Sequence, residues 1–319
     1  MSNTVHIPVM LGESIDGLQP KNGGIYIDGT LGGGSHTEEL LRRSGPDGQV
    51  LSLDVDPEAI KRAKTRLKSY GSRWKGAEGN FRDLAEIARQ EGFTPCDGIL
   101  LDLGLSSDEL EDPKRGISFR IDGPLDMRLG PHSNRDGMTA ATIVNGWREA
   151  ELVRLLREIG EERYASRIAS AIVRARSGSE IERTLQLAGI IRAAVPSGYE
   201  RGRIDPATRT FQALRIAVND ELAALQDVLK SAGEMLKPGG RIAVISFHSL
   251  EDRIVKHAFK DAEGLNATTK KPLIPSDVEI SKNPRARSAK LRIAEKFIPQ
   301  KTKIQGYAKR VRHQHDKTA

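Results

Sequence analysis

The chain of 319 residues has a single cysteine, few aromatic residues and no long apolar run. One cysteine cannot form an internal disulfide or a zinc cluster, so Cys96 is interpreted as a small buried apolar side chain. Aromatic residues make up 4% of the chain, which argues against recognition of many stacked bases on an aromatic platform. No apolar run approaches the roughly 18 residues of a membrane span, and the N-terminus lacks a secretion-signal pattern. We therefore expect a cytoplasmic protein that does not bind a membrane.

The charge is basic overall but unevenly distributed. The net charge is +7, yet residues 282–319 hold twelve Lys and Arg against Glu295 and Asp316, so this segment carries +10 and the rest of the chain −3. A basic terminus on a nearly neutral body is typical of a protein that binds a phosphate-rich partner. A solvated tail that keeps the protein in solution would have the same composition.

Three short apolar runs each end in an acidic residue that is followed by turn-forming residues: 24–28, 49–54 and 98–102. Continuous apolar runs suit strands that are buried on both faces, as in a parallel sheet. Helical stretches lie between them, including residues 57–69, where Pro57 suits a first helical position. This alternation predicts an α/β fold with a doubly wound, Rossmann-like sheet.

The strand pattern is interrupted after the third run. Apolar residues then recur at helical spacing in three stretches, residues 140–159, 164–174 and 181–194. The polar loop of residues 116–128 precedes them and is a candidate substrate lid. We predict an inserted helical substrate-recognition domain over residues 108–210.

The α/β pattern resumes after the insertion. One long helix is predicted over residues 211–236, a strand over 241–247, a helix over 249–260 with Ser249 as its N-cap, and a final strand over 290–297. Residues 1–107 and 211–319 are thus expected to form one discontinuous domain.

A glycine-rich loop, residues 29–34, follows Asp28 at the end of the first predicted strand. Glycines let the backbone approach a ligand closely. A dinucleotide site needs Gly-x-Gly-x-x-Gly, but starting from Gly32 the third glycine would fall at Thr37. An acidic residue before the first glycine is instead typical of S-adenosyl-L-methionine sites, because that cofactor has no pyrophosphate and carries an ammonium and a sulfonium. A glycine-rich turn without a ligand is the alternative.

Two further positions fit a cofactor. Asp54 ends the second predicted strand, where a carboxylate can accept hydrogen bonds from two ribose hydroxyls, whereas Asp56 is interpreted as the cap of the helix that begins at Pro57. Phe81 follows the expected third strand and would flank the adenine ring, although an ordinary core position fits it nearly as well.

Candidates for the chemistry follow the later strands. Asp102 should face the transferred group, because ligands of open α/β sheets bind at the carboxyl ends of the strands. Enzymes that methylate exocyclic amines commonly carry an acid or amide and then Pro-Pro-aromatic there; this chain has the acid only. His248 is a second candidate proton acceptor, with a structural histidine as the alternative.

Six motifs together resemble one family, at residues 28–30, 100–104, 123–128, 206–213, 246–253 and 283–288. The chain resembles the bacterial 16S ribosomal RNA (cytosine-N4)-methyltransferases over nearly its whole length. The resemblance implies a class I methyltransferase sheet, S-adenosyl-L-methionine as cofactor, and methylation of the N4 amine of a decoding-region cytidine. It also implies that the substrate is the small ribosomal subunit or its assembly intermediate.

The resemblance also assigns residues. It implies cofactor contacts for Gly34, Ser35, His36, Asp54, Phe81, Asp102 and Glu109, and the loop argument adds Asp28 and Gly32. The family usually has glutamine in a Ser-Ser-Pro-Gln-Leu context where this chain has Glu109. Asp102 and His248 are the catalytic candidates, and nothing in the sequence suggests a metal.

Other functions share some of these features. A nicotinamide-dependent dehydrogenase would share the sheet and Asp54, but the glycine spacing opposes it. A non-enzymatic ribosome-assembly factor would have the basic surface but no need of Asp28, Asp54 and Asp102 at three strand ends. A methyltransferase that acts on another nucleic acid stays open, and so does a homodimer.

Overall fold

The computed structural model describes residues 7–131, 133–134, 136–262 and 264–297. Its centre is a seven-stranded sheet of order β3-β2-β1-β4-β5-β7-β6. The first five strands are parallel, and β7 is antiparallel to both of its neighbours. This confirms the doubly wound α/β sheet. The strands are β1 (Ile25–Asp28), β2 (Gln49–Asp54), β3 (Trp74–Glu78), β4 (Cys96–Asp102), β5 (Leu236–Ser246), β6 (Leu265–Ala267) and β7 (Lys290–Lys296).

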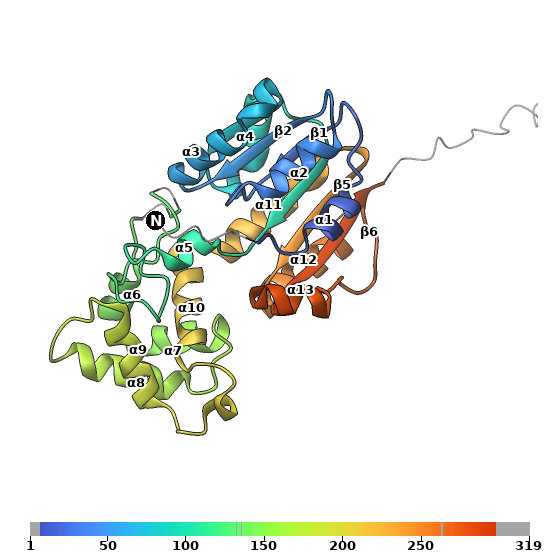
Figure 1. Ribbon diagram of the computed structural model, residues 1–319. Helices are drawn as coiled ribbons and strands as arrows, with labels where there is room; N and C mark the ends of the chain where they lie inside the picture. The colour runs from blue at the N-terminus through green and yellow to red at the C-terminus, as the bar shows by residue number, and fades with distance from the viewer. Residues whose placement is uncertain (1–6, 132, 135, 263, 298–319) are drawn as a thin grey trace, which may run out of the picture.

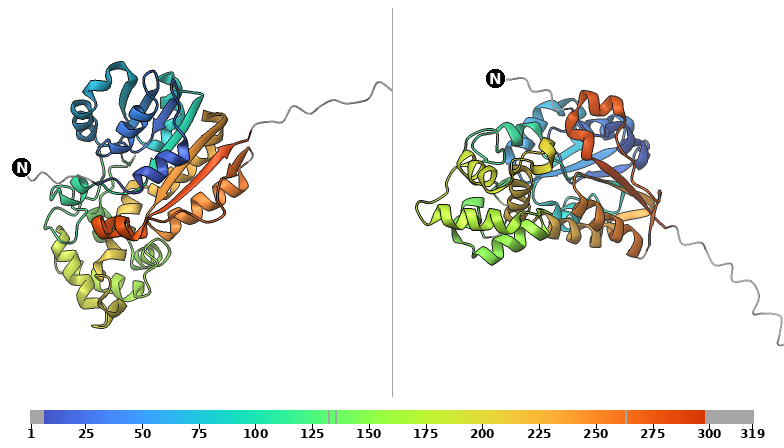
Figure 2. Two further views of the ribbon diagram at one scale, coloured as in Figure 1. Left: turned by 45° about the vertical axis from the view of Figure 1, so that its right-hand side comes forward. Right: turned by 90° about the horizontal axis from the view of Figure 1, so that it is seen from below.

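Helices cover both faces of the sheet (Figures 1 and 2). Within β5, Ala243 and Ile245 point to one hydrophobic cluster, whereas Ile242 and Val244 point to another. Side chains alternate in this way along a strand, so both faces of the sheet are apolar and buried. One face packs on α1 (Leu11–Leu18), α2 (Ser35–Arg43) and α3 (Pro57–Arg66), the other on α4 (Leu84–Gln90), α11 (Glu221–Met235) and α12 (Ser249–Asp261).

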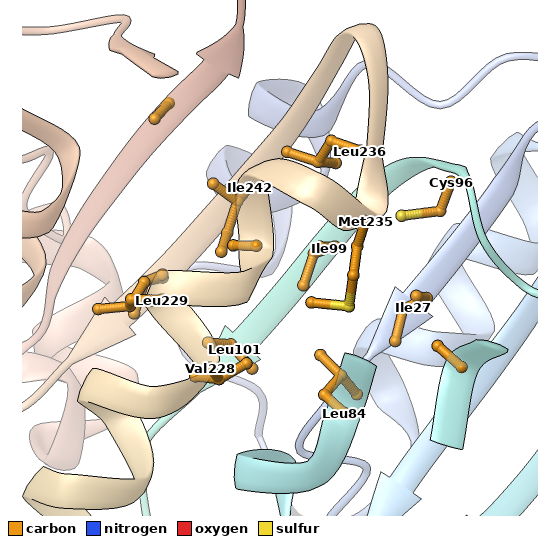
Figure 3. Close-up of a cluster of buried hydrophobic side chains, with 14 of the residues drawn as sticks. Ile27, Leu84, Cys96, Ile99, Leu101, Val228, Leu229, Met235, Leu236 and Ile242 are labelled. Carbon is orange, nitrogen blue, oxygen red and sulfur yellow. The ribbon is translucent and has the colours of Figure 1, made fainter. Parts of the chain in front are cut away.

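The cluster under α11 is shown in Figure 3. Val228, Leu229 and Met235 of the helix lie over Ile99 and Ile242 of the two central strands. Cys96 belongs to this cluster and is fully buried, and burial raises the pKa of its thiol to about 12. The interpretation of Cys96 as a buried apolar side chain is confirmed.

A separate hydrophobic cluster lies outside the sheet. Its buried members run from Leu125 to Val218, so the sequence between β4 and α11 has a core of its own. The division of the chain at residues 108 and 210 stays a prediction. The helices of this part are α5 (Ser107–Glu111), α6 (Ala140–Gly146), α7 (Glu149–Glu158), α8 (Ala165–Arg176), α9 (Thr184–Ala194) and α10 (Ala207–Asn219).

Shorter elements complete the chain. Four 3-10 turns, η1 (Lys68–Arg73), η2 (Phe81–Asp83), η3 (Tyr199–Gly202) and η4 (Pro284–Ser288), join the longer elements, and α13 (Asp277–Lys282) precedes the last strand. The structure describes the basic segment from residue 282 only as far as 297, so the rest of that predicted feature lies outside the described residues.

Two predicted helices are wrong in extent, and one predicted cap is wrong. The stretch 140–159 breaks at Trp147, which is extended, and the stretch 211–236 breaks at Asp220, which is left-handed with φ 51°. Asp220 thereby turns the chain from α10 into α11, which packs on the sheet. The N-cap of α12 is His248 rather than Ser249, because the His248 side chain accepts from the Glu251 amide.

The candidate lid, residues 116–128, is packed into the protein. Leu125 and Met127 are buried in the separate cluster, and an added Cβ at Gly116 would lie 1.7 Å from the Pro124 oxygen. Asn219 then fixes the end of the loop, donating to the Met127 oxygen at 2.8 Å and accepting from the Leu129 amide at 2.9 Å. The described structure thus holds the loop by contacts within the protein, and its role as a substrate lid stays a prediction.

None of the helices that the structure describes has the length and apolar character needed to cross a membrane. Over the same residues, no group of three or more His, Cys, Asp or Glu side chains is arranged to hold a metal ion.

Candidate active site

A cavity of about 370 Å³ lies at the edge of the sheet where the parallel strands end. Residues that follow β1, β2, β3, β4 and β5 line it, as expected for a ligand site in an open α/β sheet. The N-terminal segment adds Ile7 and Val9, and the start of α11 adds Glu221 and Ala224. Of the predicted site residues, the wall includes Gly32, Gly34, Ser35, His36, Asp54, Phe81, Asp102 and Glu109.

The glycine loop is shaped by close approach and by backbone conformation. A Cβ at Gly29 would lie 2.6 Å from Leu101 Cδ2, so any other residue would have to displace this buried side chain of β4. Gly32 and Gly34 have φ of 49° and 77°, in the left-handed region that glycine adopts without strain. Gly34 is the residue before α2, whose first residues, Ser35 and His36, therefore face the cavity.

Asp28 lies behind this loop and does not line the cavity. It is fully buried and accepts from Thr37 Oγ1 at 2.7 Å and from the Thr30 amide at 3.1 Å. Burial raises the pKa of the Asp28 carboxyl, and these hydrogen bonds oppose the rise. Asp28 pairs in register with Ser52 and Leu100, two residues below Asp54 and Asp102, so it sits one layer deeper in the sheet. The structure thus gives it contacts that hold the loop.

Asp54 faces the cavity at the end of β2. One oxygen accepts from the Gly32 amide at 2.8 Å and the other from the Asp56 amide at 2.9 Å. Burial raises the pKa of Asp54 to about 6. Asp56 accepts from the Glu58 amide at 3.0 Å, which confirms its interpretation as the cap of α3. Asp54 is therefore oriented by the loop it supports.

Asp102 ends β4 at the centre of the rim. Its amide donates to Thr30 Oγ1 at 2.7 Å, its Oδ1 accepts from the Gly104 amide at 3.3 Å, and its Oδ2 lies 3.8 Å from His36 Nδ1. Burial raises the pKa of Asp102 to about 7, and the nearby carboxylates of Asp28 and Glu251 add to the rise. A carboxyl with this pKa can gain or lose a proton near neutral pH.

Glu109 lies on the first turn of α5. Glu109 and Ser106 form a reciprocal capping box, in which the Ser106 amide donates to Glu109 Oε2 at 2.7 Å and the Glu109 amide donates to Ser106 Oγ at 3.2 Å. Burial, and after it the charge of Asp54, raises the pKa of Glu109 to about 7. Glu109 therefore adds a third poised carboxyl to the wall.

His248 does not line the cavity, whereas its neighbours Phe247 and Glu251 do. His248 Nε2 lies 2.9 Å from Glu251 Oε1, and Glu251 Oε2 accepts from the Phe247 amide at 2.7 Å. His248 thus caps α12 and holds Glu251 from behind, so the structure does not bring the predicted His248 acceptor to the cavity.

Several lining residues were not predicted from the sequence. They are Thr30, Asn80, Ser133, Asn219, Glu221, Glu251, Asn283 and Arg285. Glu251 had a signal, since an acid three residues into a helix often reaches back to its cap. No sequence pattern predicts Glu221, because its position depends on the left-handed turn at Asp220. Its carboxylate accepts two hydrogen bonds from Arg215, from Nε at 2.7 Å and from Nη2 at 2.8 Å.

The wall is strongly acidic. Among the described residues, six carboxyl groups line it, together with the guanidinium of Arg285; the carboxyl groups are those of Asp54, Asp102, Glu109, Glu111, Glu221 and Glu251. Glycine backbone, Leu103 and Phe81 supply the less polar part of the wall. A bound cation stabilises the ionised form of grouped carboxyls whose pKa is raised, so the cavity suits a cationic ligand. The carboxylates can also accept hydrogen bonds from ligand hydroxyls, and the less polar part of the wall suits a flat apolar group.

The chain is similar to several known proteins. The model of the MraW methylase family matches residues 3–297. The chain is 52% identical to the ribosomal RNA small subunit methyltransferase H of Synechococcus elongatus, over 92% of this chain and 96% of the relative. It is 49% identical to the protein of the same name from Geobacter sulfurreducens, over 92% and 99% of the two chains. A solved rRNA methylase from Streptococcus thermophilus is 13% identical, with a TM-score of 0.41 over 92% and 99% of the two chains. By its match along nearly its whole length, the chain belongs to the MraW methylase family.

Proposed function

We propose that this protein transfers a methyl group from S-adenosyl-L-methionine to the N4 amine of a cytidine in the decoding region of small-subunit ribosomal RNA, in the cytoplasm. The observation that carries the proposal is the row of carboxyls beside the glycine loop in a chain of the MraW methylase family. The names of the relatives support a small-subunit ribosomal RNA substrate.

The lining residues fit this cofactor. Asp54 would accept from the ribose hydroxyls, Phe81 and Asn80 would flank the adenine, and the buried carboxyls would hold the ammonium and the sulfonium. Gly32 and Gly34, which have left-handed backbone conformations, line the cavity, so backbone without a side chain faces the ligand there. When bound, the cofactor supplies the electrophilic methyl group.

We assign Asp102 as the acceptor of the proton that the target amine loses. The N4 nitrogen is a weak nucleophile because its lone pair is delocalised into the ring, so it must be aligned and relieved of a proton. A carboxylate at the centre of the rim, with a pKa of about 7, can accept that proton and later release it to water. Alignment of the cytosine with the methyl group can lower the activation barrier by several more kcal/mol.

His248 is assigned a positioning role through Glu251. The ring fixes the Glu251 carboxylate by a contact of 2.9 Å, and Glu251 and Phe247 face the cavity. The helical region between β4 and α11 would bind the RNA around the target nucleotide, which must leave its stack to reach the cavity.

Cofactor affinity should depend on pH. The raised pKa values of Asp54 (about 6), Asp102 and Glu109 (both about 7) mean that the folded protein holds protons that the unfolded chain has lost. Their contribution to folding stability is therefore present below the unfolded pKa of 3.8 to 4.5 and is lost as the pH rises through 6 to 7. A cationic ligand prefers the ionised carboxylates, so its affinity should rise by about tenfold or more from pH 5.5 to 7.5.

Calorimetric titration with S-adenosyl-L-methionine at several pH values measures this effect. Glu109→Gln removes one of the three groups, so the variant should give a shallower profile. An affinity that is constant across this range in the unmodified protein would contradict the assignment of these carboxyls to the cofactor.

Gly104→Ala should impair methyl transfer by about tenfold or more. A Cβ there would lie 2.7 Å from the Phe247 ring and 3.3 Å from Asp102 Oδ1, so one of these groups must shift, and small displacements of reacting groups are costly. Gly189→Ala, in α9, is the matched control because nothing lies within 4 Å of its added Cβ. Transfer rates of the two variants on the same substrate check this; equal rates would contradict it.

Label transfer tests the proposed function. The protein is incubated with methyl-labelled cofactor and with small subunits, large subunits or DNA from cells that lack this protein. We expect label in the small-subunit RNA only. Label in DNA would favour a different nucleic acid, and binding of the subunit without any transfer would favour a ribosome-assembly factor. Binding of NADH in place of S-adenosyl-L-methionine would favour a dehydrogenase.

A further inference from the structure

The helices α7 and α8 pack against each other, and the turn between them reaches the carboxyl rim of the sheet. In that turn Glu161 accepts from Ser249 Oγ at 2.5 Å and lies 3.4 Å from Arg253 Nη2. Both partners belong to the first turns of α12, directly after Phe247, which lines the cavity. The helix pair therefore begins beside the active site and extends away from it (Figure 1).

Five exposed arginines, which we call the arginine face, lie on this helix pair and the turn that joins it: Arg154, Arg157, Arg163, Arg167 and Arg174. Arg167 and Arg174 lie in α8 seven residues apart, so at 100° per residue they fall within about 20° of one another around the helix, roughly 10 Å apart along its axis. Arg163 lies two residues before α8, in the turn that reaches the carboxyl rim. The three arginines therefore follow one another from this turn along α8.

The partners of these arginines orient them without neutralising them. Arg157 donates to Ser166 Oγ at 3.2 Å, and Arg174 donates to Ser170 Oγ at 2.6 Å. The Arg163 guanidinium lies 5.0 Å from the centre of the Tyr164 ring and 5.8 Å from that of Tyr199. Hydroxyl and ring partners reduce the freedom of a guanidinium but leave its positive charge.

Other exposed arginines of the same region are paired with carboxylates. Arg148 lies 2.8 Å from Glu151, Arg183 2.7 Å from Asp122 and Arg192 2.9 Å from Asp205. Within the described ranges, no member of the arginine face has a salt bridge, although Arg154 acts on Glu151 through its charge and Glu158 and Glu161 are exposed acids nearby. The five arginines outnumber these acids, so the face keeps a net positive charge.

We propose that the arginine face binds the phosphate backbone of the RNA that carries the target cytidine. This inference rests on the proposed function. Guanidinium groups donate paired, charge-assisted hydrogen bonds to phosphate oxygens, and a row that starts beside the cavity can hold the strand that enters it. Phosphate contacts of this kind position a nucleic acid without reading its sequence.

The test is the triple variant Arg163→Gln, Arg167→Gln, Arg174→Gln, assayed on small subunits that lack the methyl group. We expect KM for the subunit to rise about tenfold or more, with kcat changed by less than about twofold, because backbone contacts serve binding rather than chemistry. Each lost phosphate contact contributes roughly 0.7 to 0.9 to the slope of the log binding constant against log salt concentration. The slope of the triple variant should therefore be shallower by about 2.

The matched control is Arg148→Gln, Arg183→Gln, Arg192→Gln, which removes the same charge from paired arginines. It should leave KM and the salt slope within about twofold of the unmodified protein, and both triples should bind S-adenosyl-L-methionine normally. Equal behaviour of the two triples would overturn the inference. If the unmodified protein transferred no methyl group, the proposed function would fail, and the salt slope of subunit binding would still decide for or against the arginine face.

Discussion

Asp102→Ala is expected to lower kcat for methyl transfer by roughly a hundredfold to ten-thousandfold at saturating cofactor, the range that general acid–base groups commonly supply. The target nitrogen loses its proton poorly by itself, and Asp102 is the carboxyl at the centre of the rim, with a pKa of about 7. Single-turnover assays on unmethylated small subunits measure the loss.

Two further variants make this prediction specific. Asp102→Asn keeps the size of the side chain and an oxygen for the Gly104 amide, so a purely structural role would preserve activity; we expect a loss comparable to that of alanine. Asp108→Asn removes the same charge from an exposed neighbour that pairs with Arg62 at 3.3 Å and does not line the cavity. It should retain activity. An Asp102→Asn variant with more than half of the normal kcat would refute the assignment.

Asp54→Ala should weaken cofactor binding by about a hundredfold or more. Hydrogen bonds to a charged acceptor contribute roughly 1.5 to 3 kcal/mol each, and two ribose hydroxyls would lose theirs together. The Gly32 amide, which Asp54 holds at 2.8 Å, also loses its acceptor, so the loop becomes less ordered before the ligand arrives. Calorimetry gives the dissociation constant directly.

The control is Asp56→Ala, two residues further along the chain. Asp56 caps α3 and lies 2.7 Å from Arg115, but it does not line the cavity. Its removal should lower the free energy of unfolding by about 1 kcal/mol or more while the cofactor dissociation constant changes by less than about threefold. If both variants lost cofactor affinity equally, the effect of Asp54 would be one of folding rather than of contact.

The sequence predicted the site best where residue type and strand end agree. Asp54 and Asp102 face the cavity because parallel strands bring their carboxyl ends to one edge. Asp28 has the same sequence context, but the register of β1 leaves it two residues below that edge. Register depends on the pairing of distant segments, so Asp28 could not be separated from the other two without the fold.

Helix ends and the residues that depend on them were predicted less well. His248 has the chemistry of a base, but its ring caps α12 and contacts Glu251. The break at Asp220 is not visible in a pattern of apolar residues that continues at helical spacing on both sides. Because Glu221 and Asn219 reach the cavity only through that break, neither could be predicted as a site residue.

The nature of the methylated nucleoside tests the central claim most directly. Small subunits from cells that lack this protein would be incubated with it and with S-adenosyl-L-methionine, and their RNA digested to nucleosides for mass spectrometry. We predict N4-methylcytidine at one position of the decoding region, formed only when both protein and cofactor are present. A methyl group on ring carbon, on ribose or on another base, or none at all, would contradict the proposal.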